Sequence, residues 1–231
     1  MSVLITNPAE AATSGRQLNA RSVDGRSITA NIFGDGASAV LMIGGIHGNE
    51  PSGARLVAHV RRWLALHPSA YAGRTVVLVA KANPDGLAHH TRTNARGVDL
   101  NRNFPSSDWG TKPRRNGDNP GVRPASEPAT RFLLKRMARF RPWLIVSVHA
   151  PYHQVDIDGP AMAVARRMSR HDHDRITRSI GYPVPGSLGT YAGKEKHISV
   201  VTLELGRRSD QKIWRAQKAA LLAAIRHPCG A

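Results

Sequence analysis

A histidine and a glutamate that stand three residues apart form the first candidate site. His47 and Glu50 belong to the run GGIHGNE at residues 44–50, which lies between an apolar stretch and a helical pattern. Side chains at this spacing can both reach one ion where a loop enters a helix, and imidazole with carboxylate suits zinc. The glycines allow a tight turn and an open approach. The pair alone is weak evidence, because such pairs also occur on solvated helices.

A second histidine extends this set. His149 follows the apolar run 144–148, so its imidazole is expected at the end of a buried strand. In open α/β sheets, ligands bind beyond the carboxyl ends of the strands, where all three side chains would then lie. Two imidazoles and one carboxylate leave a fourth position open, as in catalytic rather than structural zinc sites. The alternative for His149 is a hydrogen-bonded histidine of the core.

The elements that position these residues follow from the hydrophobic pattern. Apolar, β-branched runs alternate with amphipathic segments, which is typical of strands joined by crossover helices. The strands are predicted at 28–33, 39–43, 75–80, 143–149 and 199–204. The helices are predicted at 51–67, 127–140 and 210–225. Because the chain shows no repeat, low-complexity tract or boundary, we predict a single α/β domain over residues 1–231.

Three further segments are interpreted less directly. The glycine-rich turn at 34–36 is interpreted as joining the first two predicted strands as neighbours. Residues 106–124 are rich in Pro, Gly, Asn and Arg and predict a long loop, which in a compact domain is more often functional than idle. Residues 160–180 fit a helix that is interrupted by the polar cluster at 171–174.

Composition limits the class of protein. With 231 residues, of which 41% are hydrophobic, the chain can bury a core and is not disordered by composition. Cys229 is the single cysteine, so an internal disulfide and a cysteine-based zinc site are excluded, and a reducing compartment fits. No run approaches the roughly 18 apolar residues of a membrane span, and polar residues interrupt 1–15 where a signal peptide is apolar. We therefore expect a cytoplasmic protein with no membrane partner.

The chain is strongly basic. It has 33 Lys and Arg against 16 Asp and Glu, a net charge of +17, which raises the question of a nucleic-acid partner. The arginines are spread along the chain, in doublets such as 61–62, 166–167 and 207–208, without interleaved aromatic residues. We interpret them as a solvated surface and predict no nucleic-acid partner. The alternative from another class is a non-catalytic binder of anionic polymers built on an enzyme scaffold.

Further motifs carry a family resemblance. Between the candidate ligands lie NPDG at 83–86 and TRTNARGVDLNRNFP at 91–105, and TLELG follows at 202–206. With GGIHGNE, these motifs make most of the chain resemble the zinc metallocarboxypeptidase family, and most closely its bacterial murein peptide amidase branch. The resemblance implies an α/β/α sandwich around a central mixed, mostly parallel sheet. It also implies a hydrolase with one zinc ion, held by His47, Glu50 and His149.

The resemblance implies roles for residues outside the ligand set. Arg92 would polarise the scissile carbonyl and stabilise the oxyanion, a contribution that is usually dominant in acyl transfer. Asn101 and Arg102 would hold the terminal carboxylate of the substrate, which a guanidinium can clamp through two parallel hydrogen bonds. Glu204, at the end of the apolar run 200–203, would be the general base. The alternative for Glu204 is a strand-end carboxylate paired with an arginine.

The family also uses a mobile tyrosine over the substrate, and the chain offers two candidates for it. Tyr182 is close to the expected position, whereas Tyr191 is nearer the last predicted strand. We predict Tyr182, with packing as the alternative role for either ring. His153, four residues after His149, is an alternative metal ligand that we do not adopt.

The branch implies a substrate as well. This is the γ-D-glutamyl–diaminopimelate bond of cell-wall peptides, which are small and anionic. The second amino-acid centre of diaminopimelate needs a further polar partner, for which Asp156 and Asp158 are candidates by sequence proximity. The alternative is the aspartoacylase and succinylglutamate desuccinylase group, zinc deacylases of N-acyl amino acids with similar motifs. The NPDG run and the short chain favour the peptidase, and the sequence specifies no oligomeric state.

Overall fold

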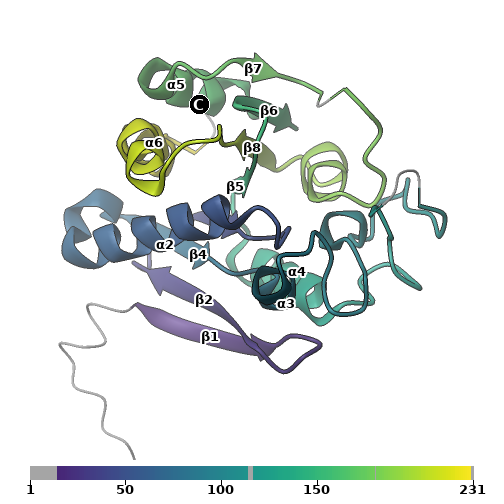
Figure 1. Ribbon diagram of the computed structural model, residues 1–231. Helices are drawn as coiled ribbons and strands as arrows, with labels where there is room; N and C mark the ends of the chain where they lie inside the picture. The colour runs from purple at the N-terminus through teal and green to yellow at the C-terminus, as the bar shows by residue number, and fades with distance from the viewer. Residues whose placement is uncertain (1–14, 114–116, 180, 230–231) are drawn as a thin grey trace, which may run out of the picture.

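A mixed sheet of eight strands organises the part of the chain that the computed structural model describes, residues 15–113, 117–179 and 181–229 (Figure 1). Its order is β1-β2-β4-β3-β5-β8-β6-β7. The strands are β1 (Arg16–Arg21), β2 (Ser27–Phe33), β3 (Ser38–Gly44), β4 (Arg74–Val79), β5 (Leu144–His149), β6 (Gln154–Asp158), β7 (Ile176–Thr177) and β8 (Ser199–Glu204).

The four central strands, β4, β3, β5 and β8, run parallel, while β2 and β6 join them antiparallel on either side. The carboxyl ends of the central strands therefore meet at one edge of the sheet. The register places His149 of β5 opposite Glu204 of β8, and Gly44 of β3 opposite Val148. Chemistry-bearing residues that are far apart in sequence are thus brought to the same edge.

Helices cover both faces of this sheet (Figure 1). They are α2 (Pro51–Leu66), α3 (Pro84–His89), α4 (Pro128–Phe140), α5 (Met162–Asp172) and α6 (Asp210–Ile225), with the shorter turns η1 (Pro68–Tyr71), η2 (Leu100–Arg102) and η3 (Gly189–Glu195). One buried apolar cluster joins α2, α5 and α6 to the sheet, and a second joins α4, η2 and η3 to the other face. The four central strands are buried on both sides for this reason.

Helix α2 lies unusually close to β5. A Cβ atom added at Gly53 would lie 2.6 Å from the carbonyl oxygen of Val148, and one added at Gly44 would lie 2.5 Å from that of Gly53. These distances are too short for any side chain, so glycine permits the approach. Pro51 starts the helix, where its missing N–H costs nothing. The helix N-terminus is thereby held over the end of β5.

The sequence predicted the central elements well, and the α/β class and mostly parallel core sheet are confirmed. The interpretation of the first two predicted strands as neighbours was wrong, because β4 lies between β2 and β3. Residues 160–180 are not one helix: α5 ends at Asp172, and β7 follows. Strands β1 and β6 were not predicted. No helix or strand occurs in the described part of the predicted loop 106–124.

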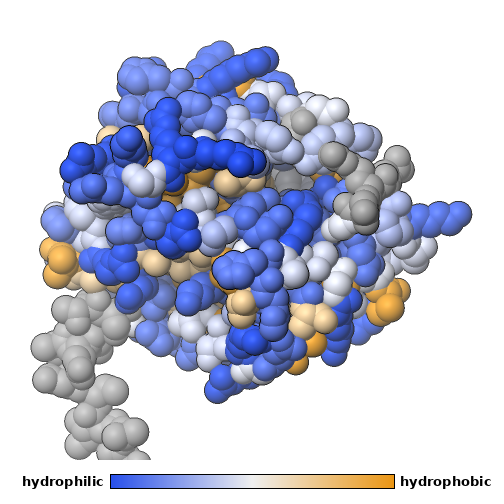
Figure 2. Space-filling view, viewed as in Figure 1, coloured by the Kyte–Doolittle hydropathy of each residue, from blue (hydrophilic) through white to orange (hydrophobic). Residues whose placement is uncertain are grey.

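Residues 1–14, on which the expectation about a signal peptide rested, lie outside the described residues, as do 114–116, Ile180 and 230–231. Within the described ranges, no helix combines the length and the apolar character needed to cross a membrane. The surface facing the viewer in Figure 2 is mostly hydrophilic, with separate hydrophobic residues.

Candidate metal centre and active site

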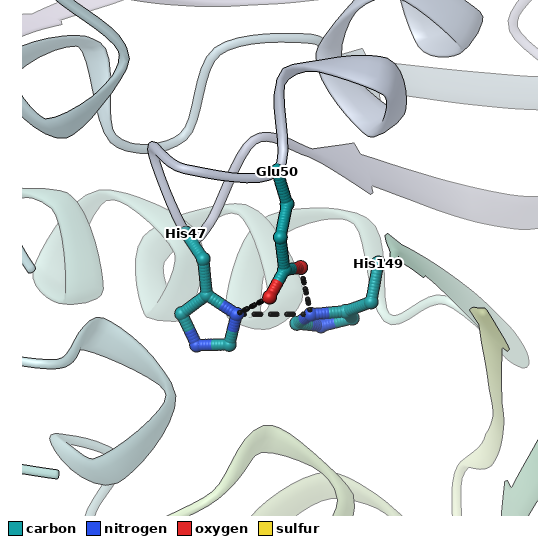
Figure 3. Close-up of side chains that lie close together, drawn as sticks. All are labelled: His47, Glu50 and His149. Carbon is teal, nitrogen blue, oxygen red and sulfur yellow. Dashed lines mark hydrogen bonds and ion pairs between the residues drawn. The ribbon is translucent and has the colours of Figure 1, made fainter. Parts of the chain in front are cut away.

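Three side chains from three element ends converge at the sheet edge (Figure 3). His47 lies in the loop after β3, Glu50 is the residue before the first turn of α2, and His149 is the last residue of β5. Glu50 Oε1 is 3.0 Å from His47 Nδ1, Glu50 Oε2 is 3.1 Å from His149 Nδ1, and the two Nδ1 atoms are 3.2 Å apart. Their ligand atoms all lie within 4.8 Å of one another. The predicted ligands are therefore brought together.

The far side of each imidazole is held by a second residue. His47 Nε2 lies 3.0 Å from Asp99 Oδ1, and His149 Nε2 lies 3.0 Å from Ser147 Oγ. A carboxylate that accepts from Nε2–H leaves the Nδ1 lone pair for a metal and raises its basicity. Two such nitrogens and one carboxylate oxygen match the donor set of catalytic zinc. The residues present therefore fit a zinc ion.

Burial and the charges of neighbouring groups shift the pKa values of the side chains in this cluster. Burial disfavours the charged form of His47, but the negative charges of Asp99 and Glu50 and their hydrogen bonds outweigh it and raise its pKa to about 9. Burial raises the pKa of Glu50, yet His47 and His149 together lower it well below its usual range. The same balance lowers the pKa of Asp99. Glu50 and Asp99 therefore stay ionised and each contributes a negative charge to the cluster.

Arg92 reaches the same cluster from the loop after α3. Its guanidinium donates to Asp99 Oδ2 from Nε at 2.9 Å, and its Nη1 lies 3.5 Å from Glu50 Oε1 and 3.4 Å from His47 Nδ1. The side chain keeps 26% of its surface exposed. Asp99 therefore fixes Arg92 and His47 together, and the predicted carbonyl-polarising arginine lies beside the predicted metal.

The predicted carboxylate anchor lies in η2. Arg102 is only 2% exposed and forms an ion pair of 3.3 Å with Asp118, while its Nη1 donates to the carbonyl of Asn101. Asn101 Oδ1 accepts a hydrogen bond from Leu188 N, which fixes the amide. Both residues line the cavity described below. Sequence reasoning did not identify Asp118, which also lies 3.9 Å from Arg92.

Glu204 ends β8 opposite His149 and is 5% exposed. Burial raises its pKa, and Glu50 adds to that rise, while the charge of His149 opposes it. Its Oε2 accepts a long hydrogen bond, 3.5 Å, from Tyr152 N. A buried carboxylate of raised pKa at the edge of a metal cluster has the environment of a general base.

The two tyrosine candidates separate clearly in space. Tyr182 lines the cavity, whereas Tyr191 is half-buried in η3 and stacks on Phe104, with ring centroids 6.2 Å apart. His153, the ligand that we did not adopt, pairs with Asp174 at 3.0 Å instead. The geometry is consistent with Tyr182 as the predicted tyrosine over the substrate.

One cavity of about 510 Å³ contains these groups. It is lined by the three predicted metal ligands and by the other predicted site residues, Arg92, Asn101, Arg102, Tyr182 and Glu204. Asp156 and Asp158 form part of its wall, and Arg55, Arg207 and Arg208 add positive charge. A cavity of this size holds a small molecule or a short peptide, with both anion- and cation-binding groups.

Known proteins share much of this sequence. The family model described as zinc carboxypeptidase matches residues 13–157. The chain belongs to the zinc carboxypeptidase family. It is 32% identical over 179 residues to murein peptide amidase A of Escherichia coli strain K12, covering 71% of this chain and 69% of that protein. Murein peptide amidase A of Vibrio campbellii is 29% identical over 198 residues, covering 81% and 77%.

Solved structures share the fold of this chain. The crystal structure of murein-tripeptide amidase from Escherichia coli O157 superposes with a TM-score of 0.76 at 24% identity, covering 98% of this chain and 99% of that one. Bovine thrombin-activatable fibrinolysis inhibitor, in complex with tick carboxypeptidase inhibitor, gives 0.79 at 17% identity, covering 94% and 92%. The predicted carboxypeptidase-like architecture is confirmed. Membership of the family makes the chain a hydrolase and implies zinc.

Proposed function

We propose that the chain is a single catalytic domain that binds one zinc ion through His47, Glu50 and His149 and hydrolyses an amide bond in murein peptides. The observation that carries this proposal is the convergence of the ligand set, two arginines and a buried glutamate in one cavity. Zinc bound there supplies a Lewis acid for the scissile carbonyl. The remaining steps belong to the protein.

Glu204 accepts the proton of the attacking water and passes it to the leaving amine. Burial raises the pKa of Glu204, which makes its carboxylate a stronger base for the first step. Arg92, held by Asp99, directs its guanidinium at the oxygen on which negative charge develops. Preorganisation matters here, since Arg92 is fixed before the substrate binds.

The terminal carboxylate of the substrate binds to Asn101 and Arg102. Arg102 is buried, and Asp118 offsets part of its charge. The Nε of Arg102 still has no hydrogen-bond partner among the described side chains and backbone groups. Two N–H groups of one guanidinium can donate to both oxygens of a carboxylate. This anchor sets which amide bond lies over the metal.

The substrate class rests on the relatives and on charge. Two relatives are named murein peptide amidase A, and a structural neighbour is named murein-tripeptide amidase. We assign the γ-D-glutamyl–diaminopimelate bond as the target on this basis. Arg55, Arg207 and Arg208 at the cavity complement an anionic peptide.

A substrate panel tests this function. Zinc-loaded protein is incubated with L-Ala-γ-D-Glu-meso-diaminopimelate and with N-acetyl and N-succinyl amino acids, and the products are identified by mass spectrometry. We expect free diaminopimelate from the first substrate. We also expect Arg102→Lys to raise KM at least tenfold, because a lysine cannot form the bidentate clamp. Turnover of the N-acyl amino acids alone would instead make the chain a deacylase.

A further inference from the structure

The loop that joins β5 to β6 holds two carboxylates of the site through its backbone. It consists of residues 150–153. Ala150 N donates to Glu50 Oε2 at 3.2 Å, and Tyr152 N donates to Glu204 Oε2 at 3.5 Å. The loop therefore contacts both a predicted metal ligand and the proposed base. Its conformation sets where these two backbone donors lie.

His153, the last residue of this loop, has an unusual backbone conformation. Its φ of +55° lies in the left-handed region, which residues other than glycine rarely adopt. His90 and His173 have similar φ values, but each directly follows a helix, where this conformation is common. His153 instead lies between two strands. Such a conformation persists where the surrounding contacts fix it.

A buried carboxylate holds the ring of His153. His153 Nε2 lies 3.0 Å from Asp174 Oδ1, and the histidine side chain is 50% exposed whereas that of Asp174 is 2% exposed. Because a carboxylate accepts hydrogen bonds, the hydrogen of this pair is on Nε2. Asp174 belongs to the polar cluster 171–174, which interrupts the helix predicted from the sequence. The cluster therefore supplies a partner for the loop.

Asp174 is anchored to two helices. Gln217 Nε2 of α6 donates to its Oδ2 at 3.0 Å, and Ser169 Oγ of α5 donates to its backbone oxygen at 3.0 Å. Both helices belong to one apolar cluster on the sheet. The ring of His153 also lies against Gly206, where an added Cβ would be 3.3 Å from the ring Cγ. His153 thus connects the helical layer to the chain just beyond β8.

We propose that His153 and Asp174 position the general base by fixing the loop 150–153 against the helices. This inference rests on the proposed function of Glu204. Tyr152 directly precedes His153, so its N–H stays directed at Glu204 only while the pair is intact. Neither member of the pair is part of the cavity wall in the described structure, so both act through the loop. Loss of the pair should lower kcat, with the metal still bound.

Two substitutions of His153 isolate the hydrogen bond. In His153→Gln the amide nitrogen can take the place of Nε2 and donate to Asp174, whereas in His153→Asn it lies too close to the backbone. Asparagine adopts positive φ readily, so His153→Asn changes the hydrogen bond and not the backbone. For the tripeptide, zinc-loaded His153→Asn should lose kcat about tenfold with KM changed by less than about twofold, as for a slightly misplaced catalytic group. His153→Gln should keep about half or more of the wild-type kcat.

The matched control is His173→Asn. His173 is exposed and has a φ of +60°, and it is not part of the cavity wall in the described structure. This variant should leave kcat and KM unchanged. Asp174→Ala removes the acceptor of the pair, and adding His153→Asn to it should lower kcat no further, because both substitutions remove the same contact.

Zinc content and thermal unfolding are measured on every variant. If His153→Asn loses zinc or stability in proportion to kcat, the role of the pair is structural and the positioning role is overturned. An equal loss of kcat in His153→Gln and His153→Asn would also overturn it, because the hydrogen bond would then not be the cause. Unchanged kcat in both variants would do the same.

Amide hydrogen exchange separates this inference from the proposed function, because it needs no substrate. Exchange at Ala150 and Tyr152, followed by NMR in the zinc-loaded protein, should be faster in His153→Asn and unchanged in His153→Gln. Wild-type protein that cleaves no tripeptide, with faster exchange in His153→Asn, would refute the function and support the fixing of the loop. Cleavage by wild-type protein with equal exchange in all variants would overturn the inference and leave the function standing.

Discussion

Glu204 and His149 are paired across β8 and β5, yet we propose different roles for them. Glu204→Gln keeps the shape of the side chain and removes its ability to take a proton. We expect this variant to retain zinc and to lose kcat about 10²–10⁴-fold, the usual contribution of a general base. His149→Ala should lose the metal itself. Metal content by elemental analysis, measured beside kcat, distinguishes the two, and equal zinc loss in both variants would contradict the separate roles.

The protonation of His47 makes a further prediction. Its pKa of about 9 means that the imidazole of the metal-free protein carries a proton at neutral pH. Zinc binds the neutral ring, so the proton must leave on binding. Zinc affinity should therefore rise about tenfold per pH unit from pH 7 and level off above about pH 9. Competition with a chelator of known affinity measures this, and a flat profile over that range would contradict the assignment.

At the scale of residues, the sequence predicted the side chains that meet in the cavity better than the side chains that hold them in place. His47 and Glu50 are three residues apart, so their spacing in the sequence was enough to predict that their side chains lie together. Asp99 contacts His47 across 52 positions, and Asp118 reaches Arg102 from a loop without regular structure. Such contacts depend on how the loops fold over the sheet edge, which no periodic pattern reports.

At the scale of elements, the approach of α2 to β5 fixes the distance between Glu50 and His149. Gly53→Ala would place a methyl group 2.6 Å from the backbone oxygen of Val148 and push the helix away. We expect the free energy of unfolding to fall by about 1–3 kcal/mol, as for overpacked cores. Zinc affinity should fall with it. Gly73→Ala, where an added Cβ meets nothing within 4 Å but φ is +68°, is a control for backbone strain alone. Unchanged zinc affinity in Gly53→Ala would contradict this coupling.

The elements that the sequence predicted are those with long apolar or amphipathic patterns, such as α2, β5 and β8. Strand β6 was missed because its cavity face is polar: Gln154, Asp156 and Asp158 alternate with only two apolar residues. The strand order near β2 was wrong because β4, which comes later in the chain, inserts beside β3. Local turn residues do not report such an insertion. The failure at β6 lies at the wall of the cavity, where polar side chains replace a core pattern.

At the scale of the whole molecule, the net charge of +17 is the most unusual property. The view in Figure 2 shows hydrophilic residues spread over that face. If this charge attracts anionic peptides, added salt should weaken the attraction. We expect KM for the murein tripeptide to rise severalfold between 20 and 500 mM salt, with kcat unchanged. Arg207→Gln at the cavity should reduce the salt dependence, whereas Arg96→Gln, which pairs with Glu127 elsewhere, should not. A KM independent of salt would assign the charge another role.

In the mechanism that we propose, hydrolysis depends on one zinc ion held by two imidazoles and a glutamate. The direct measurement is zinc content and tripeptide cleavage in the same preparation, before and after treatment with a chelator and after zinc is added back. We expect one zinc per chain, loss of cleavage with loss of the metal, and recovery of both together. A preparation that cleaves the tripeptide at full rate without bound metal would contradict it.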